Sequence, residues 1–404
     1  MKQLASAQKQ VPAWLIFLLA ASCGLIVANL YYAQPLVGLI SQSLGISTDF
    51  SGMIVTVTQL GYVLGLVFLV PLSDLIQNRR LVLLALAGVA GALLIASLTH
   101  HAAIFLVSVF LIGICSTAAQ VLVPYAAHLS SDSERGRTVG NVMSGLLLGI
   151  MFARPVAGFL SDLAGWQAIF LLSACIMTVV FLLLLWKLPE RTPEHTLSYQ
   201  EMISSLWPLF QNTPVLRRRA FYQACLFCSF SLFWTVVPQW LAQHFHLSQT
   251  GIALFALVGV GGAIASPIAG RLADKGWTEP LTVLAFSLAA GAFALTHLFQ
   301  TQASAGLAAF GVAAVVLDMA VSGNLILGQQ AIYALGNQTR GRMNGIFMSV
   351  FFLGGSLGSA AGGWLYAKGG WNAALLLGLS MPMIALIYYI TDHSLRYDDK
   401  KETL

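Results

Sequence analysis

Long apolar runs, separated by short polar loops, dominate the pattern of hydrophobic and polar positions along the chain. A helix needs about 20 mostly apolar residues to cross a bilayer. The pattern predicts twelve such spans, at roughly residues 13–36, 51–72, 81–99, 102–128, 139–163, 166–187, 220–241, 251–270, 279–299, 304–331, 343–367 and 371–391. Runs such as 81–98 lack the period of two that a membrane barrel strand would show. The pattern therefore predicts an all-α integral membrane protein.

Composition supports this prediction and excludes several classes of protein. Of the 404 residues, 58% are hydrophobic and only 9% are charged, against about 25% charged in a typical soluble domain. These values exclude a soluble enzyme and an ordinary nucleic-acid binder, although the net charge is +5. We expect no cofactor and no metal, because the sequence contains neither a Walker-type glycine loop nor clustered metal ligands. All five cysteines fall inside apolar runs, where buried thiols are expected: Cys23, Cys115, Cys175, Cys225 and Cys228.

The positions of lysine and arginine predict the orientation in the membrane. With the N-terminus placed in the cytoplasm, every lysine and arginine except Lys368 and Arg154 falls on the cytoplasmic side, including Lys2, Lys9 and Arg191. Short loops rich in these residues stay in the cytoplasm. We therefore expect both termini to be cytoplasmic, in a bacterial-type inner (plasma) membrane, and we read the basic excess as an orientation signal.

An internal repeat divides the spans into two sets of six. Residues 135–166 align without gaps on residues 340–371, and both segments begin with Arg-Gly-Arg and end with Gly-Trp. The longest polar stretch lies between the sixth and seventh spans and is rich in proline. The repeat predicts a parallel duplication. We expect an N-terminal six-helix bundle at 1–187, a cytoplasmic linker at 188–219 and a C-terminal six-helix bundle at 220–404.

Two matching loops carry a family resemblance. PLSDLIQNRR (71–80) follows the second span, and GRLADKGWTE (270–279) follows the eighth. The second loop resembles the signature loop of the major facilitator superfamily of secondary transporters. ANLYYAQPL (28–36) and ARPVAG (153–158) resemble its bacterial drug:proton antiporter-like branch. The resemblance implies two pseudo-symmetric six-helix bundles of twelve transmembrane helices that work by alternating access.

The same resemblance implies roles for the residues of both loops. It assigns conformational gating to Asp74, Arg79, Arg80, Gly270, Asp274 and Lys275. A carboxylate at a helix end can accept hydrogen bonds from the free N–H groups of a neighbouring helix start. The alternative is that these loops are ordinary charged turns that fix the topology.

Polar side chains concentrate in the first helix of each three-helix unit, and in this family those helices line the central cavity. The predicted cavity residues are Asn29, Tyr32, Gln34, Gln120, Tyr222, Gln223, Trp234, Gln239, Asn324 and Gln329. Polar groups without partners are costly in hydrocarbon, so their segregation predicts a hydrated interior. Each of them could instead bond to a neighbouring helix.

Two charged residues fall inside predicted spans. Asp318 lies near the middle of the tenth span, where an ionised carboxylate costs on the order of a few kcal/mol. We expect it to carry the coupling proton or to bind a substrate cation; a structural hydrogen bond or a pair with Arg154 is the alternative. Arg154 cannot carry a proton, because its guanidinium stays charged. It could contact an anionic substrate group or form a charge pair.

Together these features predict a transporter and not an enzyme. The expected function is proton-coupled efflux of small amphiphilic compounds or drugs by a monomer in the lipid bilayer, with protons and a small molecule as its ligands. The alternative is transport of an organic anion or sugar-like metabolite anchored by Arg154. A polytopic membrane enzyme or sensor is a remote third possibility.

Overall fold

The computed structural model describes residues 12–130, 134–190, 198–259, 262–299, 303–335 and 339–402, and within these ranges it contains helices and no strand. Lys2, Lys9 and Arg191, which the predicted orientation uses, lie outside them, as does part of the predicted linker.

The helices follow the apolar runs of the sequence. Those of the first half are α1 (Ala13–Ala28), α2 (Val37–Leu44), α3 (Met53–Leu64), α4 (Asn78–Leu98), α5 (Ala102–Ser116), α6 (Ala118–Leu129), α7 (Arg135–Ala164) and α8 (Gln167–Lys187). Short helical turns occupy η1 (Gln34–Leu36), η2 (Thr48–Phe50), η3 (Gly65–Leu69) and η4 (Val70–Asp74). The remaining helices are α9 (Tyr199–Asn212), α10 (Pro214–His244), α11 (Gln249–Val258), α12 (Gly262–Asp274), α13 (Thr278–Phe299), α14 (Ala303–Tyr333) and α15 (Arg340–Glu402).

Several of the predicted spans are interrupted helices. In the first span, α1 ends at Ala28 and the short turn η1 follows, and the fourth span is divided between α5 and α6 at Thr117. In the eighth span, α11 ends at Val258 and α12 is described from Gly262 onward. The last two spans form the single element α15, which has non-helical backbone angles at Gly369 and Gly370. The positive φ of 61° at Gly370 suits a glycine at this sharp bend.

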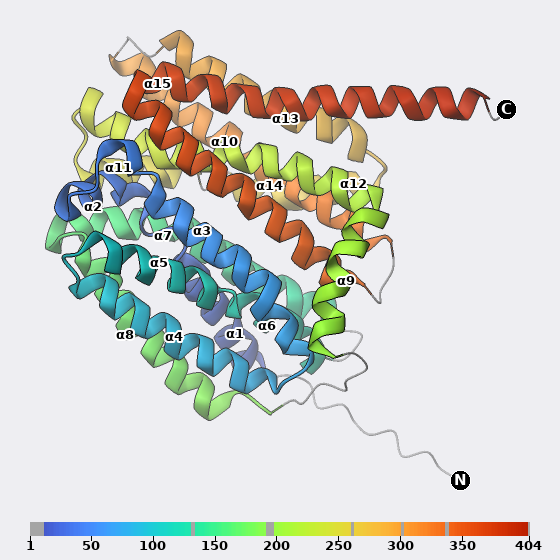
Figure 1. Cartoon of the computed structure of the whole chain (residues 1–404), viewed down its shortest axis with the longest axis horizontal. Coiled ribbons are helices and arrows are strands. Elements are labelled where there is room, and N and C mark those ends of the chain that lie inside the picture. Colours follow the sequence, from blue (N-terminus) through green and yellow to red (C-terminus); the bar gives the residue numbers. More distant parts are fainter. Residues whose placement is uncertain are drawn as a thin grey trace.

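The helices form the two six-span bundles that the repeat predicts. In Figure 1 the blue-to-green helices α1–α8 make one bundle, and the yellow-to-red helices α10–α15 make the other. The bundles touch mainly through α3 against α15 and α7 against α11. The protein therefore has the predicted all-helical, two-bundle fold, whereas the exact boundaries 1–187, 188–219 and 220–404 stay a prediction.

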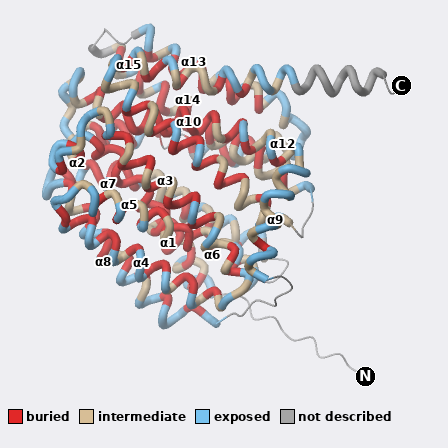
Figure 2. The backbone as a smooth tube through the Cα atoms, in the orientation of Figure 1, coloured by how far each residue is buried: buried red, intermediate tan, exposed pale blue. Residues whose placement is uncertain are grey.

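The outer surface of both bundles is apolar, as lipid contact requires. Nine helical segments in the described part of the chain are long and apolar enough to cross a membrane, and one of them, Arg340–Thr391, holds two of the predicted spans. Buried residues follow the inner faces of the helices in Figure 2, but large apolar side chains also point outward. Phe17 is 75% exposed and Leu84 is 70% exposed. In water such exposure would be costly, whereas lipid tails cover it.

Helix α9 lies across one end of the molecule, which we call the linker end. Ser198 and Glu201 form a capping box at its start, and the backbone N–H of Ser198 lowers the pKa of Glu201 by donating to its carboxylate. The helix contacts both bundles. The Tyr199 hydroxyl donates to the carbonyl of Phe68 at 2.9 Å, and a guanidinium nitrogen of Arg342 donates to Ser205 Oγ at 2.8 Å.

Candidate functional site

Both charged residues of the predicted spans lie in one cluster where the bundles meet. We call Gln34, Arg154, Trp234 and Asp318 the central cluster. Gln34 begins η1 and Arg154 lies on α7, both in the first bundle; Trp234 lies on α10 and Asp318 on α14, both in the second. All four are more than nine-tenths buried. The cluster therefore lies at the contact between the two bundles.

Arg154 is held by one hydrogen bond and three aromatic rings. Its Nε donates to Gln34 Oε1 at 2.9 Å. Its Cζ lies 4.4 Å from the ring centroid of Trp234, 5.1 Å from that of Phe230 and 5.2 Å from that of Tyr31. A cation over aromatic faces is stabilised by the ring quadrupoles. Arg154 Nη2 and Gln34 Nε2 are buried and have no hydrogen-bond partner among the described residues.

Asp318 is held by the same indole. Trp234 Nε1 donates to its Oδ1 at 2.9 Å. Glycines at the end of α11 and the start of α12 make room for this pair. A Cβ at Gly259 would lie 2.7 Å from Asp318 Oδ2, and a Cβ at Gly262 would lie 2.6 Å from Asp318 Cβ. A larger residue at Gly259 would displace the carboxyl group, and one at Gly262 would displace the backbone of Asp318.

Trp234 therefore links the two charged residues. No ion pair among the described residues joins Arg154 to Asp318 directly. The guanidinium nevertheless acts electrostatically on the carboxyl group. Of the alternatives that the sequence left open, this conformation shows an indirect pairing, with the indole contacting both groups.

A second polar contact between the bundles was missed by sequence reasoning. Gln59 Nε2 on α3 donates to Ser231 Oγ on α10 at 2.9 Å, and Ser231 shares a 2.7 Å hydrogen bond with Ser359 on α15. A single amide in an apolar run gives no periodic signal. Phe230 was also missed, although its position four residues before Trp234 on one helix face was a usable signal.

The remaining predicted cavity residues mostly bond within one bundle. Asn29 donates to two carbonyls of α1 and accepts from Ser173, which Tyr32 also contacts. Gln120 donates to the Tyr62 hydroxyl at 3.0 Å. These side chains tie helices of the first bundle together.

In the second bundle the pattern is similar. Asn324 donates to Gln223 Oε1 at 2.7 Å, and Gln329 donates to Asn344 at 3.2 Å. Tyr222 packs edge-on against Phe286 and two further tyrosines. Gln239 donates to a carbonyl of its own helix, and its Cγ would lie 3.6 Å from a Cβ at Gly38 in the first bundle. Only Gln34 and Trp234 of the predicted cavity residues belong to the central cluster.

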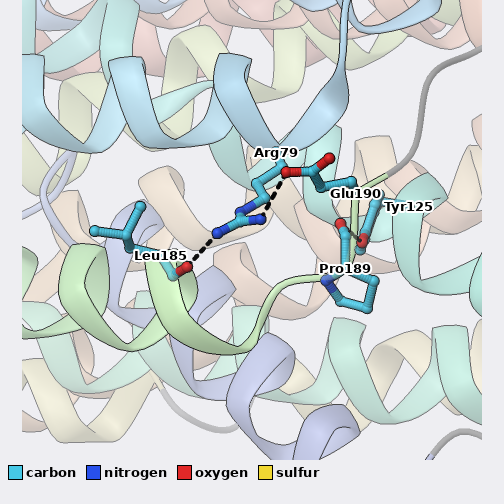
Figure 3. Close-up of polar contacts among 5 residues, drawn as sticks. All are labelled: Arg79, Tyr125, Leu185, Pro189 and Glu190. Carbon is cyan, nitrogen blue, oxygen red and sulfur yellow. Dashed lines mark hydrogen bonds and ion pairs between the residues drawn. The ribbon is translucent and has the colours of Figure 1, made fainter.

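The predicted gating residues all lie toward the linker end. Arg79 donates to the carbonyl of Leu185 and pairs with Glu190 at 3.0 Å, so that it holds the end of α8 (Figure 3). The Tyr125 hydroxyl also holds this segment, because it donates to the carbonyl of Pro189 at 2.6 Å. Arg79 therefore acts within the first bundle in this conformation.

Most of the other predicted gating residues are more exposed than Arg79. Asp74, Arg80, Asp274 and Lys275 are exposed, and Gly270 is half-buried. Asp274 accepts a hydrogen bond from Gln330 at 3.3 Å, and Gln330 also donates to the carbonyl of Gly270. Both of these hydrogen bonds stay within the second bundle.

The end of the molecule farthest from α9, which we call the opposite end, is closed by contacts between the bundles. Asp162 at the end of α7 accepts a hydrogen bond from the Thr250 backbone N–H at 2.6 Å, at the start of α11. Lys368 pairs with Asp49 at 2.9 Å. Gly52 packs so closely on α15 that a Cβ there would collide with the Ser359 carbonyl oxygen.

A groove of about 750 Å³ lies between α1 and α7. Its lining changes from polar, with Arg137, Asn141 and Ser144, to apolar, with Leu148 and Phe152, along one face of α7. The polar side chains lie nearer the linker end, because α7 begins there.

Comparisons with known proteins agree on one family. The family model described as Major Facilitator Superfamily matches residues 16–322 and 219–403. The uncharacterized transporter YgaY of Escherichia coli O157:H7 is 36% identical over 376 residues, which cover 93% of this chain and 94% of YgaY.

Solved structures share the fold at low sequence identity. A POT family transporter in complex with 5-aminolevulinic acid superposes with a TM-score of 0.74 at 15% identity, covering 93% of this chain and 95% of that one. A bacterial homolog of the human lysosomal transporter Spinster, inward-facing and unoccupied, superposes with a TM-score of 0.72 at 14% identity, covering 93% and 96%.

Proposed function

The chain belongs to the major facilitator superfamily and is a multi-pass membrane transporter, and from this premise we propose that it couples the transport of a small amphiphilic organic compound to proton movement. One observation carries the proposal. Asp318 is a buried carboxyl group at the contact between the bundles, where its partner Trp234 also touches Arg154 of the other bundle. A proton on Asp318 changes the charge of this contact.

The position of the contacts between the bundles supports alternating access. The bundles are latched at the opposite end by Asp162 with Thr250 and by Asp49 with Lys368. Rocking of the bundles would release these contacts and separate Arg154 from Trp234. The charge state of Asp318 sets how strongly the indole is held, so proton binding and bundle movement would be coupled at one place.

We place the linker end on the cytoplasmic side of a bacterial inner membrane, following the loop charges. The conformation closed at the opposite end is then the one that opens toward the cytoplasm. We propose that the protein works as a monomer, because each chain holds a complete central cluster.

Two substrate classes suit the central cluster. Export of an amphiphilic drug-like compound in exchange for protons is supported by the rings of Tyr31, Phe230 and Trp234 and by Asp318 as the acidic group. An organic anion is the second candidate, and one observation favours it. Arg154 Nη2 is a buried cationic donor that has no partner among the described residues.

The coupling role of Asp318 is testable without knowing the natural substrate. Purified protein in liposomes is screened with ethidium as a cationic amphiphile and with aromatic monocarboxylates, and flux under an imposed pH gradient is compared with exchange at equal pH. Asp318→Asn should abolish the gradient-driven flux and keep the exchange. Glu279→Gln, at an exposed carboxylate, is the control. Normal gradient-driven flux in Asp318→Asn would refute the proposal.

A further inference from the structure

We propose that Arg154 and Gln34 form a carboxylate subsite, that the substrate is a monocarboxylic acid with a small apolar or aromatic body, and that its anion and one proton move together. This inference rests on the proposed function, since it takes Asp318 as the proton site.

Two buried hydrogen-bond donors without partners mark the subsite. Arg154 is 4% exposed and Gln34 is fully buried. Gln34 Oε1 already accepts from Arg154 Nε, which directs the amide nitrogen of Gln34 and Nη2 of Arg154 to hydrogen-bond acceptors outside this pair. Both nitrogens lack a partner among the described residues. Buried donors are almost always paired, so two unpaired donors on bonded side chains indicate an acceptor that arrives from outside.

The guanidinium of Arg154 indicates the chemistry of that acceptor. A guanidinium holds a carboxylate through parallel N–H···O bonds, and it does so better than an ammonium group because its fork is planar. A cationic ligand would be repelled by Arg154. The charged and titratable groups that act on Arg154 are Asp318 and Tyr31, with no second cation among the described residues. The site therefore suits a single negative charge.

The aromatic rings beside Arg154 indicate the body of the ligand. The rings of Tyr31, Phe230 and Trp234 lie within 5.2 Å of the guanidinium carbon and come from both bundles. They present apolar faces beside the donors. When the bundles part, a compact apolar or aromatic group attached to the carboxylate would replace the contacts among the rings and between the rings and Arg154. The same group would exclude water from the ion pair of Arg154 with the substrate carboxylate.

The proton site of the proposal is Asp318, and few charged or titratable groups face it. The groups that act on Asp318 are Arg154 on α7, Tyr31 after α1 and Trp234 on α10. The facing parts of α11 and α12 present Gly259 and Gly262. Helices α13 and α15 also pack on α14, but within the described residues they bring no charge that acts on Asp318.

The charges of the cluster set the sign of the coupling. With Asp318 ionised, its charge and that of Arg154 cancel. A substrate carboxylate then leaves one net negative charge in a buried site, and a like charge nearby disfavours the ionised form of Asp318. Asp318 takes up a proton, the loaded site is neutral again, and the anion and the proton cross together. A cationic substrate would instead favour the ionised form of Asp318, so its binding would bring no proton uptake.

The experiment measures ligand binding and proton uptake on the purified full-length protein. Monocarboxylates with linear, branched and aromatic bodies are each compared with the primary amine and the alcohol of the same body; one such set is 3-phenylpropanoate, 3-phenylpropylamine and 3-phenylpropanol. Binding is read from thermal shift and calorimetry at two pH values. Proton exchange is read by repeating the titrations in buffers of different ionisation enthalpy. We expect each carboxylate to bind better than the amine and the alcohol of the same body, and we expect its binding to be accompanied by proton uptake.

Variants separate the subsite from general stability. Arg154→Gln should weaken carboxylate binding about 10- to 100-fold, as expected for loss of a charged hydrogen bond. Arg154→Lys keeps the charge and should weaken it less, and Gln34→Leu tests the second donor if the arginine variants do not fold. Arg219→Gln is the matched control, because Arg219 is a partly buried cation of the second bundle that bonds Thr282. It should bind carboxylates normally.

The outcomes distinguish this inference from the proposed function. Asp318→Asn should still bind carboxylates but without proton uptake. Amines binding better than carboxylates, proton release on binding, or no carboxylate binding across the panel would each overturn the subsite, even if Asp318→Asn abolishes coupled flux. Carboxylate binding that depends on Arg154, combined with normal coupled flux in Asp318→Asn, would keep the anion subsite and refute both Asp318 as the proton site and the proposed function.

Discussion

Replacing Gly52 by alanine should force the opposite end of the transporter open. The added Cβ would collide with the Ser359 carbonyl oxygen and would lie 3.4 Å from the Cα of Gly363. The backbone of Gly52 has a φ of −62°, which alanine adopts freely. The substitution therefore acts through the contact between α3 and α15 and not through the local backbone.

The size of the effect follows from the cost of overpacking. Inserting a methyl group into a tight contact costs roughly 1–3 kcal/mol. The clash exists only while the bundles touch, so this cost falls entirely on the closed conformation. The ratio of open to closed molecules at the opposite end should then rise about 5- to 150-fold.

The measurement is a distance distribution between spin labels on the two bundles. Ser43 and Asn372 are exposed at the opposite end and suit labelling after replacement by cysteine. The five native cysteines are first removed. Gly91→Ala is the control, because a Cβ at Gly91 in α4 meets nothing within 4 Å. If Gly52→Ala gives the same distances as this control, the close approach does not hold the opposite end shut.

Two further predictions concern single contacts. Asp162→Asn removes a negative charge from the start of α11, where it is worth about 0.3–1 kcal/mol, so the same spin-label measurement should show a two- to five-fold shift toward the open opposite end. An unchanged distribution would show that the negative charge of Asp162 does not hold this end closed. Arg79→Ala frees the end of α8 by removing its contacts with Leu185 and Glu190, and we expect a lower melting temperature with substrate affinity unchanged. A selective change in transport cycling at constant melting temperature would instead support the gating role predicted for Arg79.

The spans were predictable because length and apolarity decide whether a helix can cross a bilayer. The interruptions within them were not. Hydropathy is blind to the end of α11 at Val258 and to the close approach of Asp318, on another helix, to Gly259 and Gly262. The division of the fourth span at Thr117 has the same character, since the span stays apolar on average although it contains Ser116, Thr117 and Gln120.

The site was predictable where a residue is costly on its own. Asp318 and Arg154 stand out because a charge inside a span demands an explanation. Their shared partner Trp234 could be named only as one of many polar or aromatic candidates, because its pairing depends on the rotation of α10 against α14. Tyr222 shows the same limit: it lies on the predicted helix, but that helix turns it into an aromatic cluster of the second bundle.

Helix α9 is bonded to both bundles and therefore restricts how far they can move relative to each other at the linker end. Its residues Tyr199 and Ser205 are bonded to different bundles, through Phe68 and Arg342, and six residues of helix span about 9 Å. A rigid rod fastened at two points fixes the spacing of its anchors. A stroke that widens the gap between Phe68 and Arg342 beyond the reach of these side chains should break one of the two hydrogen bonds, and we expect their strength to affect how fast the transporter cycles.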